Sequence, residues 1–139
     1  LENPTPTNIS HKTDHAASFA IFTNGTFRIF TSTMYHNLSS DVYIQSSNPN
    51  VVYVKKKDTT WNDFFNTLPF KLSKDCLTTG TKQTFCDSEN GKLKFYINGK
   101  EDKNALDKEI KSDDMLLVTY GNENENLIQK QLQQLQQIK

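Results

Sequence analysis

The two cysteines are the residues whose spacing points most directly to a chemical bond. Cys76 and Cys86 stand ten positions apart in KDCLTTGTKQTFCD, on either side of a turn at 78–80. Residues that flank a hairpin turn face each other across two strands, and this suits disulfide geometry. We therefore predict a disulfide, which implies an oxidising compartment. Two free thiols in a reducing cytosol are the alternative interpretation.

The histidines are the candidate metal ligands. A metal site needs three or four ligands that converge, and His11, His15 and His36 are the candidates, with Asp14 beside them. His11 and His15 are four positions apart and would align on a helix, but the Pro- and Thr-rich flanks disfavour one. Solvated imidazoles that bind nothing are the competing interpretation.

Catalytic signatures are not found in the sequence. If Cys76 and Cys86 are bridged, neither can act as a nucleophile, and the chain has no Gly-x-Ser-x-Gly elbow and no glycine-rich phosphate loop. Its five glycines stand mostly in short turns. We therefore expect a protein that is not an enzyme and holds no cofactor.

Three sequons could accept N-linked glycans if the chain is secreted. They begin at Asn8, Asn24 and Asn37. The chain has 14 Asn and 25 Ser plus Thr in 139 residues, so chance alone gives about 2.5 such patterns. The sequons fit a secreted chain without requiring one.

Composition narrows the range of partners. The 16 basic and 16 acidic side chains cancel, so no broad basic field would attract nucleic acid. No apolar run approaches the roughly 20 residues that span a bilayer, and we expect no transmembrane segment. Residues 1–16 are polar and show no leader, as in a mature secreted product.

The expected organisation is one domain with two tails. Residues 1–16 should be an extended linker, residues 17–121 an α+β domain, and residues 122–139 a Gln-rich amphipathic helix. The domain should begin with a hairpin around the Asn24-Gly25 turn, because both turn positions tolerate positive φ. In that hairpin Phe19, Ile21, Phe27 and Ile29 alternate as one face would.

The elements that follow are read from their periodicity. Residues 41–55 should form a second hairpin, and 58–68 a helix capped by Asp58 or Thr59. The apolar run MLLVTY suits a central strand that is buried on both faces. The helix should pack through an apolar stripe at i, i+3, i+4 and i+7: Trp61, Phe64, Phe65 and Leu68.

The C-terminal helix needs a surface to cover, because an isolated helix of this length is marginal in water. Its stripe can pack on the chain's own sheet or on a partner subunit, or the segment can be a disordered tail. The candidate interaction residues of this stripe are Leu127, Ile128, Leu132, Leu135 and Ile138.

The C-terminal half of the domain resembles a known fold. In LKFYINGKEDKNALDKEIKSDDMLLVTYG a turn with acidic residues leads into an apolar strand, and this resembles the last strands of ubiquitin-like β-grasp domains. The resemblance covers about residues 51–121 and implies a mixed sheet with one packed central helix. Conjugation through a terminal glycine is not expected, because Gly121 is internal and Asn122 follows it.

A second resemblance is narrower. The runs HAASFAIFTNG, DTTWNDFFNTLPFKL and DDMLLVTYGNE, with the two cysteines, look like a mostly uncharacterised family of small secreted or membrane-anchored archaeal and bacterial proteins. The resemblance covers about residues 15–125 and implies an extracellular or cell-surface location. Many members of that family are His-rich before the helix, which implies metal, but here Tyr53 and Lys55 stand where His is expected.

These patterns lead to one functional hypothesis and one alternative. We expect a non-enzymatic extracellular structural or interaction domain, a subunit of a cell-surface or filamentous assembly that self-associates or binds another surface protein. The alternative is a monomeric secreted module that binds a metal or a small ligand.

Overall fold

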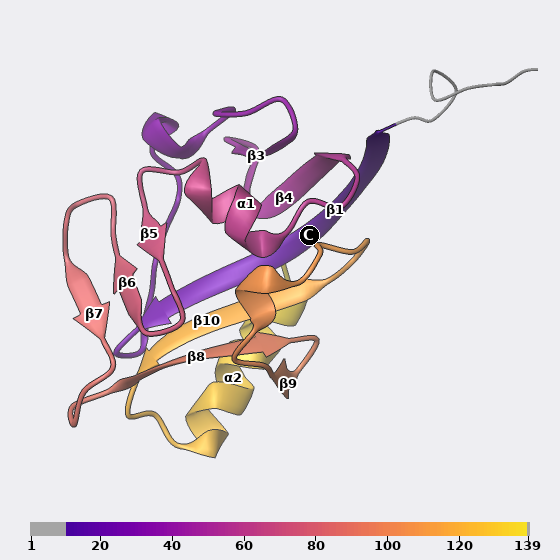
Figure 1. The fold of residues 1–139 in the computed structure, drawn as a ribbon. Helices are drawn as coiled ribbons and strands as arrows, with labels where there is room; N and C mark the ends of the chain where they lie inside the picture. The colour runs from indigo at the N-terminus through magenta and orange to yellow at the C-terminus, as the bar shows by residue number, and fades with distance from the viewer. Residues whose placement is uncertain (1–10, 139) are drawn as a thin grey trace, which may run out of the picture.

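A mixed sheet of seven strands forms the centre of the fold (Figure 1). The computed structural model describes residues 11–138. The strand order is β3-β4-β1-β10-β8-β9, and β2 pairs with the end of β1. The strands are β1 (Lys12–Thr23), β2 (Thr26–Phe27), β3 (Val42–Gln45), β4 (Asn48–Lys56), β8 (Lys92–Ile97), β9 (Lys100–Glu101) and β10 (Met115–Gly121).

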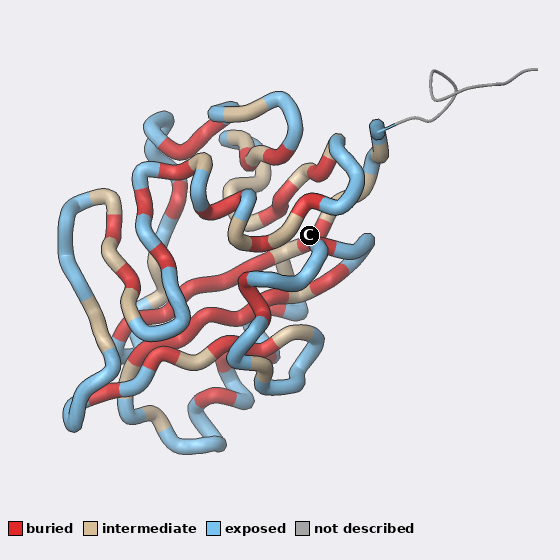
Figure 2. Tube along the Cα trace, viewed as in Figure 1, coloured by how far each residue is buried: buried red, intermediate tan, exposed pale blue. Residues whose placement is uncertain are grey.

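The two central strands, β1 and β10, are parallel. Phe19 pairs with Leu116 and Ile21 with Val118, while β4 and β8 flank the pair in antiparallel orientation. Leu116, Leu117 and Val118 are all fully buried. The prediction of a central strand buried on both faces is therefore confirmed (Figure 2).

An aromatic core covers one face of the sheet beneath helix α1 (Trp61–Asn66). The ring of Phe19 meets those of Phe64 and Phe65 edge-on, with centroids 5.5 and 5.8 Å apart. Such edge-to-face pairs add to the free energy gained by burial. The predicted stripe is confirmed, because Trp61, Phe64, Phe65 and Leu68 are all buried.

The cap of α1 differs from the prediction. Thr60, and not Asp58 or Thr59, is the N-cap: its hydroxyl accepts from the Asp63 backbone N–H, and the Asp63 carboxylate accepts from the Thr60 backbone N–H. Asp58 takes a positive φ of 63° and lies in a turn before the helix. The reciprocal capping box selects the start, because it satisfies two otherwise unpaired N–H groups together.

Helix α2 (Glu125–Gln136) covers the opposite face of the sheet. Asn124 caps it by accepting from the Leu127 backbone N–H at 3.0 Å. Ile128, Leu132 and Leu135 are buried against β1, β8 and β10, together with Ala20, Phe22 and Leu117. Of the three alternatives for the C-terminal segment, packing on the chain's own sheet is the one that the structure shows.

A second, three-stranded sheet stands beside the main one. It consists of β5 (Lys71–Leu72), β6 (Cys76–Thr78) and β7 (Thr84–Cys86). Cys76 and Cys86 pair directly across β6 and β7, and their sulfurs are bonded, which confirms the predicted disulfide. The Tyr120 hydroxyl donates to the Cys86 carbonyl at 3.0 Å and so ties this hairpin to β10.

The linker predicted for residues 1–16 is wrong for residues 12–16. Strand β1 begins at Lys12, and its first half pairs with β4, as His15 does with Val54. Backbone hydrogen bonds between strands depend little on the type of side chain. A polar segment can therefore join a sheet when it lies next to a strand with an unpaired edge. Residues 1–10 of the predicted linker lie outside the described residues, and His11 precedes β1.

The first hairpin forms at Asn24-Gly25, but the prediction that Phe19, Ile21 and Phe27 share one face is wrong. The turn sets Phe27 opposite Phe22, and residues directly opposite one another point to the same face. Phe27 therefore packs with Phe22 on the α2 side, away from Phe19 and Ile21. The chain then leaves the sheet, and Ile29 is 66% exposed.

Candidate functional site

The histidines predicted as metal ligands have structural roles or lie on the surface. His15 donates its Nε2–H to the Ile110 carbonyl at 2.8 Å, and His36 donates its own to the Phe30 carbonyl at 2.8 Å. His36 is buried, whereas His11 is exposed. His15 therefore fixes the loop at Ile110 to β1, whereas His36 joins two parts of the segment between β2 and β3.

The candidate ligands do not converge. Within residues 11–138 no three His, Cys, Asp or Glu side chains lie together as a metal would require. Asp14 instead accepts from the Lys55 ammonium, with Nζ and Oδ1 2.6 Å apart. This hydrogen bond holds the pKa of the exposed Asp14 carboxyl below its usual value and raises the pKa of Lys55.

Two of the three sequons can be placed. Asn24 and Asn37 are both exposed, each in a turn with positive φ of 49° and 55°. Both side chains are therefore accessible to a modifying enzyme. Asn8 lies outside the described residues.

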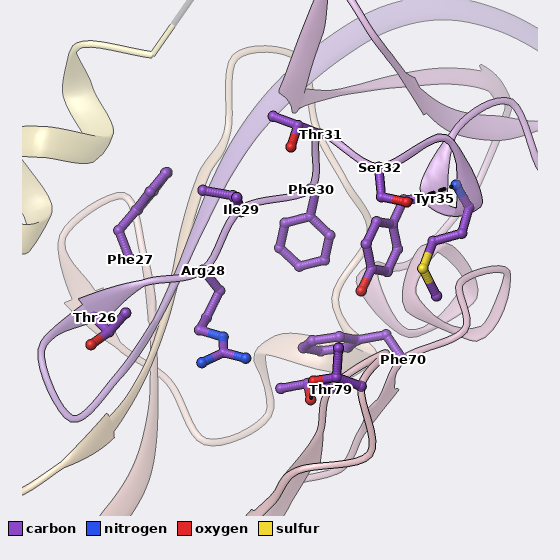
Figure 3. A pocket seen from close by; sticks show the side chains of 12 residues that line it. Thr26, Phe27, Arg28, Ile29, Phe30, Thr31, Ser32, Tyr35, Phe70 and Thr79 are labelled. Carbon is purple, nitrogen blue, oxygen red and sulfur yellow. Dashed lines mark hydrogen bonds between the residues drawn. The ribbon is translucent and has the colours of Figure 1, made fainter.

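A hollow of about 540 Å³ lies between the segment that leaves β2 and the tip of the disulfide hairpin (Figure 3). Segments from three parts of the chain surround it, so no local sequence pattern could reveal it. Its lining residues are Thr26, Phe27, Arg28, Ile29, Phe30, Thr31, Ser32, Met34, Tyr35, Phe70, Thr79 and Thr81.

Buried aromatic rings form the inner wall of the hollow. Phe30 is 1% exposed, and its ring lies 4.9 Å from that of Tyr35 and 5.5 Å from that of Phe70, measured between centroids. Phe30 also packs edge-on against Phe19 in the main core. The aromatic inner wall is therefore packed against the main core.

The hairpin tip forms the facing wall. Gly80 lies so close to Tyr35 that a Cβ atom there would overlap the Tyr35 hydroxyl. Arg28 joins the two walls, because its Nη2 donates to the Gln83 Oε1 at 3.1 Å. The disulfide at the base of the hairpin restrains this second wall.

Exposed apolar side chains occur in the segment that borders the hollow. The described residues include four exposed large hydrophobics, and three of them, Ile29, Met34 and Leu38, stand within ten positions of one another. Ile29 and Met34 also line the hollow. Sequence reasoning missed this site because it placed Ile29 on one face of the hairpin with Phe19 and Ile21. The isolated apolar residues at 34 and 38, inside a Ser/Thr-rich loop, were the available signal.

Arg28 supplies the charge of the hollow. It is the single arginine among the 16 basic residues of the chain, and its side chain points into the hollow (Figure 3). It forms no ion pair with any carboxylate of residues 11–138; its partners are the Gln83 amide oxygen and, at 3.4 Å, the Thr23 hydroxyl. No acidic side chain lines the hollow among the described residues.

The stripe predicted as an interaction surface is mostly internal. Ile128, Leu132 and Leu135 are 2, 8 and 1% exposed, and Ile138 is partly buried. As an external docking stripe the prediction is therefore wrong, because the same side chains cover the sheet. Leu127, which is 44% exposed, faces solvent.

No protein-family model, curated protein or solved structure matches the chain. Function must therefore be inferred from the geometry described above. Among the helices of residues 11–138, none combines the length and the apolarity needed to cross a membrane.

Proposed function

We propose that this chain is a non-enzymatic extracellular interaction domain of β-grasp type, and that it binds a protein partner at the hollow beside Ile29 and Met34. The observation that carries the proposal is that two exposed apolar side chains, Ile29 and Met34, line a concave surface. Contiguous exposed apolar patches commonly mark protein interaction sites.

The strand connections support a β-grasp assignment. The first long strand, β1, lies parallel to the last, β10, and the antiparallel strands β4 and β8 flank the pair. Helix α1 follows β4 in the chain and covers one face. On this scheme the small sheet β5–β7 and helix α2 are additions to the basic fold.

The disulfide supports an extracellular or cell-surface location. Disulfides persist in oxidising compartments and are rare in a reducing cytosol. The bond between Cys76 and Cys86 also restrains one wall of the hollow. The accessible turns at Asn24 and Asn37 are compatible with the same location.

The partner is another surface protein or a second copy of this chain in a cell-surface assembly. Helix α2 gives this idea little support, because its apolar stripe is already occupied by the sheet. The proposed docking surface is therefore the hollow and not the stripe of α2.

Photocrosslinking tests the proposed function. A photoactivatable residue at position 29 should give a discrete adduct with the partner on source cells, because Ile29 is 66% exposed at the edge of the hollow. The matched control places the same residue at Leu127, which is 44% exposed on α2. Equal labelling from both positions, or no adduct from position 29, would contradict the proposal.

A secreted small-ligand module is the second candidate. The volume of the hollow, about 540 Å³, favours it, because small-molecule sites commonly enclose roughly 300–1,000 Å³. Binding of decanoate to the hollow, mapped by chemical-shift changes, with no crosslinked protein from position 29 would favour this candidate.

A further inference from the structure

We infer that the hollow takes a peptide segment of the partner in which a carboxylate stands next to an apolar side chain. The inference rests on the proposed function and specifies the chemistry of its site. Three independent features lie along the same short segment. Its apolar side chains are exposed, and within residues 11–138 some of its main-chain groups lack a hydrogen-bond partner and its arginine has no carboxylate partner.

Ile29 and Met34 would contact the apolar side chain of the peptide. They are 66% and 42% exposed and border the hollow next to the buried ring of Phe30. Covering them would remove apolar surface from water, and each contact would be favourable. An unbranched, adaptable side chain such as that of Met34 also fits varied apolar partners.

The main chain between Arg28 and Ser32 would pair with the peptide backbone. The backbone N–H groups of Ile29 and Thr31 have no hydrogen-bond partner within residues 11–138. Both residues are exposed, while Phe30 between them is buried, so the segment presents alternate positions to solvent. Free main-chain groups of this kind pair readily with a peptide added as a strand.

Arg28 would bind the carboxylate. A guanidinium carries five N–H donors, and only two of those of Arg28 are directed at protein acceptors, the Gln83 and Thr23 oxygens. The planar fork matches the two oxygens of a carboxylate, and such pairs combine charge with defined geometry. Because no lining residue is acidic, a basic peptide would lack a counter-charge.

Peptide selection tests the inference. The probe is a phage library of random dodecapeptides displayed with no free carboxyl end, selected on the immobilised intact chain. Enriched sequences should place Asp or Glu beside an aliphatic or aromatic residue. Synthetic copies of them should shift the amide resonances of Ile29 and Thr31, because those N–H groups gain partners.

Substitutions test the named contacts. Arg28→Gln should weaken binding of the selected peptide by roughly 10- to 100-fold, the range for loss of a charged hydrogen bond, and Arg28→Lys should recover only part of it. Ile29→Ser should also weaken binding. Leu127→Ser removes a comparably exposed side chain elsewhere and should leave affinity unchanged. Circular dichroism melts check that each variant folds.

The outcomes separate the inference from the proposed function. Peptides that map to the hollow but carry no acidic residue, or that bind Arg28→Gln undiminished, overturn the inference and leave the interaction domain standing. Decanoate binding at the hollow with no selected peptide overturns both in favour of the small-ligand module. Acidic–apolar peptides that require Arg28 and Ile29 support both.

Discussion

Gly80 shows how one residue shapes the hollow. It stands at the tip of the disulfide hairpin, where the absence of a side chain lets the backbone approach the Tyr35 ring. Tyr35 is itself held by Phe30, with ring centroids 4.9 Å apart, so it cannot move away without disturbing the aromatic wall. A small residue at this point is therefore a requirement of packing between two segments 45 positions apart.

Gly80→Ala should lower the free energy of unfolding by about 1–3 kcal/mol, the usual cost of overpacking a well-filled contact. The added Cβ would overlap the Tyr35 hydroxyl. Denaturant melts measure the effect, and Tyr35→Phe serves as the partner variant because it removes that hydroxyl. In the double variant the loss should be smaller than the sum of the two single losses. Strict additivity would show that the contact does not restrain the hairpin.

At the scale of elements, α2 packs on the second face of the sheet and shields it from solvent. Its charged side chains and most of its amides are exposed, whereas Gln131 is buried. Ile128, Leu132 and Leu135 fill the space above β1 and β10. The helix therefore belongs to the folding unit. This explains why a segment rich in Gln, which on composition alone could be a disordered tail, adopts a defined position.

Leu135→Ala should lower the free energy of unfolding by about 2–4 kcal/mol, because Leu135 is 1% exposed and its removal leaves a cavity. Leu127→Ala is the matched control on the same helix. Since Leu127 is 44% exposed, its loss should change stability by less than about 0.5 kcal/mol. Thermal or urea melts distinguish the two. Similar small effects for both would mean that α2 is not packed on the sheet.

At the scale of the whole molecule, the disulfide hairpin joins the main sheet to the hollow. Its base contacts β10 through Phe85 and Tyr120, whose ring centroids are 5.4 Å apart, and its tip reaches Arg28 and Tyr35. One short crosslinked hairpin thus connects the central strand with the proposed binding surface.

The double change Cys76→Ala and Cys86→Ala should lower the free energy of unfolding by about 2–3 kcal/mol, because the crosslink closes a loop of ten residues in the unfolded chain. Amide exchange should rise at residues 79–83 before it rises in β1 and β10, since the hairpin can open locally. The control is Thr78→Ala with Thr84→Ala, an adjacent cross-strand hydroxyl pair 3.1 Å apart, which should cost far less. If the free energy of unfolding did not change in the double variant, the disulfide would not restrain the hairpin.

Patterns confined to one element were predictable. The two cysteines flank one turn, and Trp61, Phe64 and Phe65 recur at helical spacing within one helix. The predictions of a disulfide and of a buried helical stripe were therefore confirmed. The errors concern pairings between elements. Nothing local shows that residues 12–16 extend β1 along β4, or that the Asn24-Gly25 turn sets Phe27 on the face of Phe22.

The sequence by itself determined the α+β class, the disulfide, the helices and the buried central strand, because each follows from periodicity or spacing within a short window. Only the tertiary structure decided where α2 packs, that the histidines stay apart, and that Arg28, Tyr35 and Thr79 line one hollow. The physical reason is distance along the chain. The hydrogen bond between Arg28 and Gln83, for example, joins residues 55 positions apart. The pattern of apolar side chains in a segment predicts which residues are buried, but it does not predict which other segment they pack against.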